Sequence, residues 1–247
     1  MANLVVDIGN SLIKVAVFNN RQLDHTEAFT DTKPELVDAL FAKHEISHSI
    51  MSDVSGKAAA LETLLAERSE YIRFSAKTAA GIEMHYLTPE TLGPDRLAGV
   101  IAASRLYPQK DSLIIDAGTC ITYDMVDRDG RYFGGSISPG MNMRLKALNN
   151  YTGKLPLIEA PADFHEWRGN DTRSSILSGV LEGATLEVEG FIEKYNSQYS
   201  GIQVILCGGD ADFFDTRLKN SIFAHSVKTE PHLVLKGLNE VIHHYND

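Results

Sequence analysis

The amino-acid sequence predicts an α/β fold with two similar lobes, each a mixed sheet flanked by helices, and a cleft between the lobes. Short apolar runs typical of buried strands alternate along the chain with segments in which apolar residues recur every three or four positions, as on one face of a helix. A second observation is that one strand–turn–strand pattern occurs twice. Together these features indicate two related α/β halves.

The repeated pattern is an apolar strand, a turn containing Asp-x-Gly, and a second strand in which apolar residues alternate with others. Its two aspartates, Asp7 and Asp116, are 109 positions apart. Asp-Gly turns are common, so a chance match is the alternative to duplication. With duplication, the lobe boundary should fall between a helix and a strand near Tyr107–Asp111. The expected lobes are residues 1–110 and 111–247.

The apolar pattern of the N-terminal half predicts strands that alternate with helices. Leu4–Val6 is a continuous apolar run, and the alternation from Ile13 to Val17 adds the second strand of a hairpin. Apolar residues on one face predict helices at 34–43 and 57–67, with a short strand at 46–51 between them. The order therefore favours a sheet that begins with a hairpin.

The C-terminal half predicts the same order, followed by one long helix. Its apolar residues recur at spacings of three and four over residues 176–195, and the segment contains Gly179 and Gly183. Each glycine in a helix costs about 1 kcal/mol relative to alanine. We therefore expect close backbone approach at this pair, by internal packing or at a dimer seam. The other predicted elements are strands at 113–115, 121–125 and 204–206, a strand from Phe133, and helices from Met141 and from about Pro231.

Composition and charge narrow the class of protein. The 247 residues include 23 basic and 33 acidic side chains, a net charge of −10, which argues against a nucleic-acid partner. Two cysteines, Cys120 and Cys207, suit a reducing compartment. No apolar run approaches the ~18 residues of a membrane span, and the first charged residue comes too early for a signal peptide. We expect a cytoplasmic protein without a membrane partner.

The two Asp-x-Gly turns are the main candidates for chemistry. Glycine in such a turn lets backbone N–H groups approach an oxygen-rich ligand. The hydroxyls of Ser11 and Thr119 add donors, and each aspartate can hold a cation or its bound water. Lys14 lies on the strand after the first turn, where it could reach a phosphate, although most lysines are simply solvated. Two facing turns would bind a nucleoside triphosphate between the lobes, whereas two ordinary hairpin turns would bind nothing.

The segment Gly93-Pro94-Asp95-Arg96 opens a predicted helix. Proline suits the first turn, and the helix dipole favours the carboxylate form of Asp95, the form that a general base requires. Arg96 could bind a substrate carboxylate with two hydrogen bonds. The alternative is that Asp95 caps the helix and Arg96 is a surface residue.

Three further segments are weaker candidates. The glycine-rich strand end 134–140 offers backbone donors beside a phosphorylated ligand, and 208–210 follows a buried strand in a similar way. Thr172 is expected to cap the long helix. The sequence His44-Glu45-Ile46-Ser47-His48 matches a zinc-protease motif, but it crosses a predicted helix end, where the two histidines would not share a face.

Taken together, DIGNSLIK at 7–14, GPDR at 93–96, DAGTCIT at 116–122 and the segment 134–140 closely resemble the type III pantothenate kinases. That family belongs to the actin/hexokinase/Hsp70-like superfamily, whose members have two RNase H-like lobes. The order and spacing of the motifs match over nearly the whole chain. This sequence has Ser11 where the family usually has threonine, and Cys120 where it usually has alanine.

The resemblance implies ATP-dependent phosphorylation of pantothenate to 4′-phosphopantothenate, the first step of coenzyme A biosynthesis. It implies that Asp95 is the general base, that Asp116 binds a monovalent cation (K⁺ or NH₄⁺), and that ATP is bound with Mg²⁺. The family is usually a homodimer in which substrate residues can come from both subunits. The implied ATP-binding residues are Asp7, Ile8, Gly9, Asn10, Ser11, Leu12, Ile13, Lys14 and Thr119. The implied pantothenate-binding residues are Tyr86, Gly93, Pro94, Asp95, Arg96 and Thr172.

Two other functions remain open from the sequence. Another small-molecule kinase of the same fold could act on a sugar, although a neutral sugar would not need Arg96. A non-catalytic actin-like or regulatory protein would bind nucleotide without transferring phosphate. A substrate panel with labelled ATP would distinguish these functions.

Overall fold

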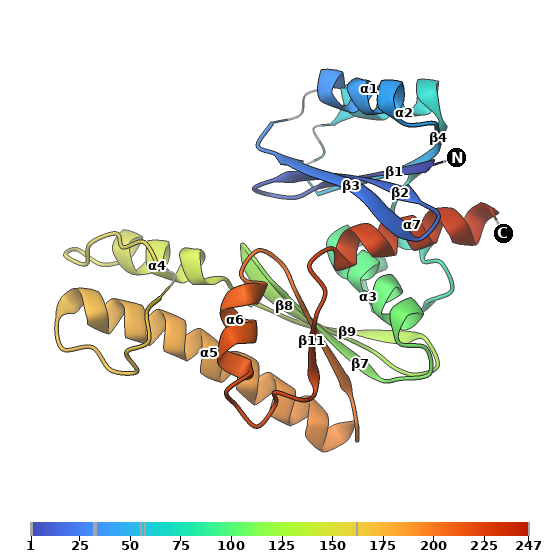
Figure 1. The fold of residues 1–247 in the computed structure, drawn as a ribbon. Coiled ribbons are helices and arrows are strands. Elements are labelled where there is room, and N and C mark those ends of the chain that lie inside the picture. The colour runs from blue at the N-terminus through green and yellow to red at the C-terminus, as the bar shows by residue number, and fades with distance from the viewer. Residues whose placement is uncertain (1, 32–33, 55, 57, 162, 247) are drawn as a thin grey trace. The chain divides into compact units, whose positions relative to one another are not determined.

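The computed structural model describes residues 2–31, 34–54, 56, 58–161 and 163–246 of the chain (Figure 1). Its strands are β1 (Ala2–Ile8), β2 (Ile13–Asn19), β3 (Gln22–Phe29), β4 (Ile46–Asp53), β5 (Glu70–Arg73), β6 (Glu83–Met84), β7 (Ser112–Ala117), β8 (Cys120–Val126), β9 (Arg131–Pro139), β10 (Gln203–Cys207) and β11 (Val227–Thr229). Its helices are α1 (Pro34–Lys43), α2 (Ala59–Arg68), η1 (Ala76–Thr78), η2 (Pro89–Thr91), α3 (Pro94–Leu106), α4 (Met141–Asn150), α5 (Thr172–Gln198), α6 (Ala211–Leu218) and α7 (Leu233–Asn246).

The first sheet has the strand order β3-β2-β1-β4-β5. The strand β1 is antiparallel to β2 and parallel to β4, so it is central and buried on both faces. One face packs under α1 and α2 through Leu4, Val6 and Leu61. Figure 1 shows α7 on the opposite face. A continuous apolar run is what such a two-sided position requires.

The helices α3 and α7 lie side by side, and α7 also contacts β1. Their backbones meet at Gly237 of α7, where a Cβ would overlap the carbonyl oxygen of Ala98. The buried Asn239 joins α7 to the sheet, because Asn3 Nδ2 donates to Asn239 Oδ1 at 2.9 Å. The close backbone contact at Gly237 and the hydrogen-bonded amide of Asn239 therefore fix how closely α7 packs against α3 and this sheet.

The second sheet has the order β11-β10-β7-β8-β9-β6. Apart from β6, this order repeats that of the first sheet, with β7 in the place of β1 and β10 in the place of β4. The core on one face of this sheet is formed with α4, α5 and α6 and includes Tyr123, Leu181 and Phe214. The predicted fold class of two mixed sheets flanked by helices is thus confirmed.

The chain divides into two compact units. The first unit contains residues 1–109, 126–134 and 232–247, and the second contains 110–125 and 135–231. Both the predicted lobes and these units divide the chain near residue 110. The units differ from the predicted lobes in that residues 126–134 and α7, the last helix, belong to the first unit. The helix α7 does so because it packs on α3 and β1.

The expected helices and strands occur, with adjusted ends. The helix expected at 57–67 is α2, which begins at Ala59, and Lys57 lies outside the described residues. The internal packing expected at Gly179 and Gly183 is wrong, because a Cβ at either position would meet no atom of this chain within 4 Å, and a dimer seam at this pair stays a prediction. The histidines of the zinc-protease match are also separated by structure, since His44 follows α1 and His48 lies on β4. No helix among the described residues is both long and apolar enough to cross a membrane.

Candidate active site

The first Asp-x-Gly turn joins β1 to β2 in the first unit. Asp7 and Lys14 are direct partners across this hairpin, and Gly9 N donates to Leu12 O at 3.0 Å to close the turn. The Asp7 side chain is buried, with 7% of the residue exposed, whereas Asn10 and Ser11 are exposed. The hairpin therefore presents backbone and hydroxyl donors to solvent above a buried carboxylate.

Positive charge gathers beside this hairpin at the start of α7. Burial lowers the pKa of His232, and the charges of Lys236 and Lys14 lower it further from its ordinary 6.5. His232 is therefore favoured as the neutral imidazole near pH 7, while the two lysines supply positive charge. Sequence reasoning identified Lys14 alone, because α7 is far away along the chain.

The GPDR segment begins α3, as predicted. Gly93 is the N-cap residue, and Pro94 occupies the first turn. Arg96 N donates to Asp95 Oδ1 at 2.9 Å, and a Cβ at Gly93 would lie 2.6 Å from the same oxygen. The carboxylate of Asp95 thus folds over Gly93 at the positive end of the helix, where its charged form is favoured. Any side chain at position 93, even that of alanine, would displace this carboxylate.

Arg96 is buried, with 8% of the residue exposed, so the alternative that it is a surface residue is wrong. Its guanidinium carbon lies 5.7 Å from the centroid of the Tyr86 ring, and Tyr86 stacks on Tyr132 with centroids 6.0 Å apart. Gly134 completes this arrangement, because a Cβ there would lie 2.7 Å from the Tyr86 ring. The structure brings the predicted residues Tyr86 and Arg96 together, and it adds Tyr132 and Gly134.

The second Asp-x-Gly turn follows β7 in the second unit. Asp116 pairs with Cys207 across β7 and β10, so the segment after β10 reaches the same edge of the sheet. Gly208 there has φ +94°, and a Cβ on it would overlap the Asp116 carboxylate and the Ala117 carbonyl oxygen. Asp210 N donates to Ala117 O at 2.9 Å, and burial raises the pKa of the Asp210 carboxyl.

The glycine-rich strand end packs on this second turn. Gly140 N donates to Thr119 O at 3.1 Å, and a Cβ at Gly140 would lie 2.6 Å from that oxygen. Gly135 similarly lies against the backbone of Tyr123 on β8. The glycines predicted as a wall beside a ligand therefore allow β9 and α4 to contact β8 and the Thr119 turn closely.

A polar network that sequence reasoning did not find holds this strand end. Arg144 Nη2 donates to Ser138 Oγ at 2.7 Å and to Glu187 Oε2 at 2.6 Å, while Tyr123 Oη donates to Glu187 Oε1 at 2.9 Å. Burial alone would raise the pKa of Glu187, but the hydrogen bonds from Arg144, Ser138 and Tyr123 outweigh it and lower the pKa. Glu187 is therefore held as a charged carboxylate beneath β9.

Thr172 is exposed and begins α5, but it is not the cap that the sequence predicted. The N-cap is Asp171, whose side chain accepts from Ser174 N at 2.7 Å in a capping box. These hydrogen bonds hold the pKa of Asp171 below its ordinary 3.8. The sequence contained this signal, since aspartate is followed by serine three residues later.

The predicted residues therefore form two groups. The first unit holds the hairpin 7–14, Tyr86 and the segment 93–96. The second unit holds Asp116, Thr119 and Thr172. Among the described residues, no three histidine, cysteine or acidic side chains gather as a metal-binding cluster.

Two sheets of one strand order, each with a glycine-bearing turn after its first long strand, define a duplicated α/β fold of two mixed sheets. Solved structures of similar fold include a Campylobacter jejuni protein described as a conserved putative Baf family transcriptional activator (TM-score 0.62, 20% identity, 98% of each chain). Another is a putative N-acetylmannosamine kinase from Listeria monocytogenes (TM-score 0.53, 12% identity, 100% of this chain and 99% of that one). At these identities the likeness supports the fold alone.

The family itself follows from sequence comparison. The type III pantothenate kinase family model matches residues 3–194. A type III pantothenate kinase from Phocaeicola vulgatus is 41% identical over 247 residues, covering 99% of both chains. The chain belongs to the type III pantothenate kinase family.

Proposed function

We propose that this chain phosphorylates pantothenate with ATP, and that Asp95 is the general base of the reaction. Membership of the type III pantothenate kinase family supports the overall reaction, which is the first step of coenzyme A biosynthesis. The position of the Asp95 carboxylate at the start of α3 is the observation that supports its role.

Asp95 suits a general base because its environment favours the charged carboxylate. The hydrogen bond from Arg96 N and the N-terminal end of α3 both stabilise negative charge. The carboxylate accepts the proton of the pantothenate hydroxyl while that oxygen forms a bond to the γ-phosphorus. The bond from phosphorus to the bridging oxygen breaks, and ADP leaves. Such in-line transfer depends mainly on alignment and charge neutralisation.

Arg96 is the proposed partner of the pantothenate carboxylate. Its guanidinium is buried beside the Tyr86 ring, which leaves a planar cation in a setting where an ion pair is stronger than in water. Gly93 and Pro94 would form the adjoining wall. Thr172, at the start of α5, would supply a further hydroxyl to the same substrate.

The ATP phosphates would be held by residues 7–14 and by Thr119. The closed hairpin offers backbone N–H groups, Ser11 a hydroxyl and Lys14 a positive charge. A divalent metal ion bound with ATP neutralises phosphate charge, and Asp7 is the carboxylate that would hold it or its bound water. The buried Asp7, which directly precedes the turn closed by Gly9 and Leu12, fits that role.

Asp116 would hold a monovalent cation, K⁺ or NH₄⁺. The missing Cβ of Gly208 lets the backbone after β10 approach this carboxylate closely, and oxygen ligands suit such a hard cation. We further propose a cytoplasmic homodimer, with no nucleic acid or membrane as a partner, in keeping with its net charge of −10.

The test is the K⁺-dependent formation of phosphopantothenate by wild type and by Asp95→Asn. The substitution should lower turnover by ~10²–10⁴ while ATP affinity stays nearly unchanged. Glu35→Gln is the matched control, because Glu35 is also a carboxylate in the first turn of a helix in the same unit. A near-normal rate in Asp95→Asn would remove Asp95 from the role. ATP binding without any turnover by wild type would support a non-catalytic relative instead.

A further inference from the structure

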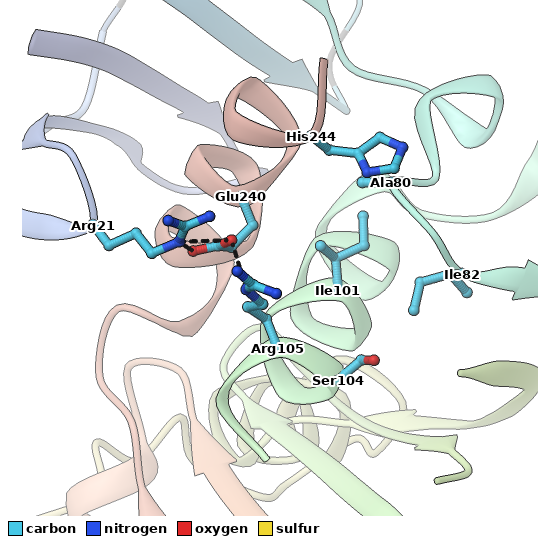
Figure 2. Close-up of a pocket in the computed structure, with 8 residues that line it drawn as sticks. All are labelled: Arg21, Ala80, Ile82, Ile101, Ser104, Arg105, Glu240 and His244. Carbon is cyan, nitrogen blue, oxygen red and sulfur yellow. Dashed lines mark hydrogen bonds and ion pairs between the residues drawn. The ribbon is translucent and has the colours of Figure 1, made fainter. Parts of the chain in front are cut away.

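A cavity of about 430 Å³ lies within the first unit, away from the residues proposed for the kinase reaction (Figure 2). Four separate segments line it: the turn between β2 and β3, the segment after η1, the C-terminal part of α3 and the C-terminal part of α7. Its volume falls within the range of small-molecule sites, roughly 300–1,000 Å³. Neither the hairpin 7–14 nor the segment 93–96 contributes to it.

Positive charge exceeds negative charge in the lining. Arg21 Nε donates to both oxygens of Glu240, at 2.8 and 3.1 Å, and Arg105 Nε lies 3.3 Å from Glu240 Oε2. One carboxylate is thus shared by two guanidinium groups, in a protein whose net charge is −10. The bond to Arg105 is longer than the ~2.7–2.9 Å of strong charge-assisted bonds, so this arginine can turn toward another anion.

The exposed fractions of the two arginines suit ligand binding. The Arg21 side chain is 46% exposed and that of Arg105 is 61% exposed, whereas Glu240 is only 14% exposed. Each arginine contacts Glu240 through its Nε atom. The terminal nitrogens of each planar guanidinium are further donors that can bind phosphate oxygens.

The cavity also has polar and apolar surfaces of the kind that orient a small molecule. Figure 2 shows the ion pairs on one side and the side chains of Ile82 and Ile101 on the other. Ser104 lies one helical turn after Ile101 and next to Arg105, and its hydroxyl can donate to an anion. A ligand with a charged end and an apolar end would match this division.

The turn that contributes Ala80 and Ile82 is conformationally strained. Ala80 has φ +44° and Gly81 has φ +84°, and Ile82 N donates to Ala79 O at 3.0 Å across them. Turns with two positive φ values favour asparagine and glycine, so alanine is unfavourable at the first position. Strained residues concentrate at ligand sites, and this one brings Ile82 to the cavity.

We propose that this cavity binds a small phosphate monoester that carries a short apolar chain. The phosphate group is held by the guanidinium groups of Arg21 and Arg105 and by the Ser104 hydroxyl. The chain lies on Ile82 and Ile101. A phosphate group suits this lining better than a carboxylate does, because its three terminal oxygens can accept hydrogen bonds from both guanidinium groups and from the Ser104 hydroxyl at once.

The test is calorimetric titration of butyl phosphate into the full chain. A saturating non-hydrolysable ATP analogue with Mg²⁺ occupies the proposed nucleotide site, so that phosphate binding there does not contribute. We expect saturable binding, with butyl phosphate binding more tightly than inorganic phosphate or butyrate, and with butanol not binding. Ligand-induced shifts of the methyl resonances of Ile82 and Ile101 would locate the binding at the cavity.

Substitutions separate the charged and apolar contributions. Arg105→Gln should weaken butyl phosphate binding by about tenfold or more, because a bond to a charged group is lost. Ile82→Ala should weaken butyl phosphate binding while leaving the weaker binding of inorganic phosphate unchanged. Arg68→Gln is the matched control, since Arg68 is another half-exposed arginine that pairs with a carboxylate in this unit, and it should have no effect.

The result that would overturn the proposal is the absence of saturable binding by wild type. Binding that Arg105→Gln and Arg68→Gln weaken equally, or that leaves the two isoleucine methyl groups unshifted, would overturn it as well. The ion pairs would then serve only to fasten α7 to α3 and to the β2–β3 turn. Because wild-type binding and its methyl shifts need no substitution, a variant that fails to fold does not prevent the test.

Discussion

The ring of Tyr86 lies against the Cα of Gly134, so closely that a Cβ at Gly134 would come to 2.7 Å from Cδ2 of the ring. Gly134 also has φ +101°, a conformation that side chains disfavour. Since the Arg96 guanidinium lies over the same Tyr86 ring, the orientation of the proposed carboxylate-binding arginine depends on a glycine that is 38 positions away.

Gly134→Ala should therefore raise the KM for pantothenate, roughly tenfold, because small displacements at a substrate site have large effects. The KM for ATP should change little. Steady-state kinetics with each substrate varied in turn measure both values. Gly201→Ala is the control, because Gly201 also has a positive φ, +74°, but has open space around it. An unchanged KM for pantothenate in Gly134→Ala would show that the Tyr86 stack does not position the substrate.

Two helical glycines should respond to alanine with opposite signs. Gly237→Ala should lower the free energy of unfolding by about 1–3 kcal/mol, because the new methyl group would overlap the Ala98 carbonyl. Gly179→Ala should raise it by roughly 0.5–1 kcal/mol, because the new methyl group meets open space and alanine favours the helix. Urea unfolding of both variants beside wild type measures the difference. Equal effects would contradict this interpretation of the α3–α7 contact.

Loss of the Arg144–Glu187 ion pair should change the KM for ATP more than the KM for pantothenate. Glu187→Gln removes the charge that Arg144 binds while Arg144 also holds Ser138, two residues before the glycine that contacts Thr119. We expect a loss of about 1–3 kcal/mol in the free energy of unfolding and a higher KM for ATP.

Tyr123→Phe is the milder companion of that variant. It removes one hydrogen bond to Glu187 and keeps the stacking of the ring on Phe191, so it should cost about 1 kcal/mol and leave the KM for ATP near the wild-type value. A KM for ATP that rises equally in both variants would point to a general loss of packing.

Asp171 should give α5 a pH-dependent contribution to stability. Hydrogen bonds from Ser174 lower the pKa of Asp171 in the folded chain. The stability that Asp171 adds is therefore fully present above its unfolded pKa of 3.8, and it is lost as the pH falls through the lower pKa of the folded chain. Wild type should be more stable than Asp171→Ala at pH 7, and the difference should shrink in acid. Thermal unfolding at a series of pH values measures it.

Asp171→Asn provides the control for that titration. Asparagine can still cap the helix, but it has no proton to gain in this range. Its stability relative to Asp171→Ala should therefore stay constant as the pH falls. If the stability difference from Asp171→Ala shrinks equally in acid for wild type and for Asp171→Asn, another group causes the effect.

Much of the fold follows from patterns that act over a few residues. The apolar run 4–6 and the alternation from Ile13 predict β1 and β2, because strand burial alternates with a period of two, and the periodicity of 176–195 predicts α5. The helix start at Pro94 is predicted for the same kind of local reason. The expectation for Thr172 was wrong by one residue, since a capping box at Asp171 competes with it.

The sequence by itself determined the strand and helix order, the two Asp-x-Gly turns, and a motif set specific enough to indicate the family. Each of these depends on neighbours within a turn or a hairpin. Only the tertiary structure decided that Gly208 lies against Asp116, that Gly134 supports Tyr86, and that α7 returns to the first unit. Such contacts join residues that are far apart along the chain. They depend on which strands are adjacent and how closely two backbones approach, and periodicity carries no information on either.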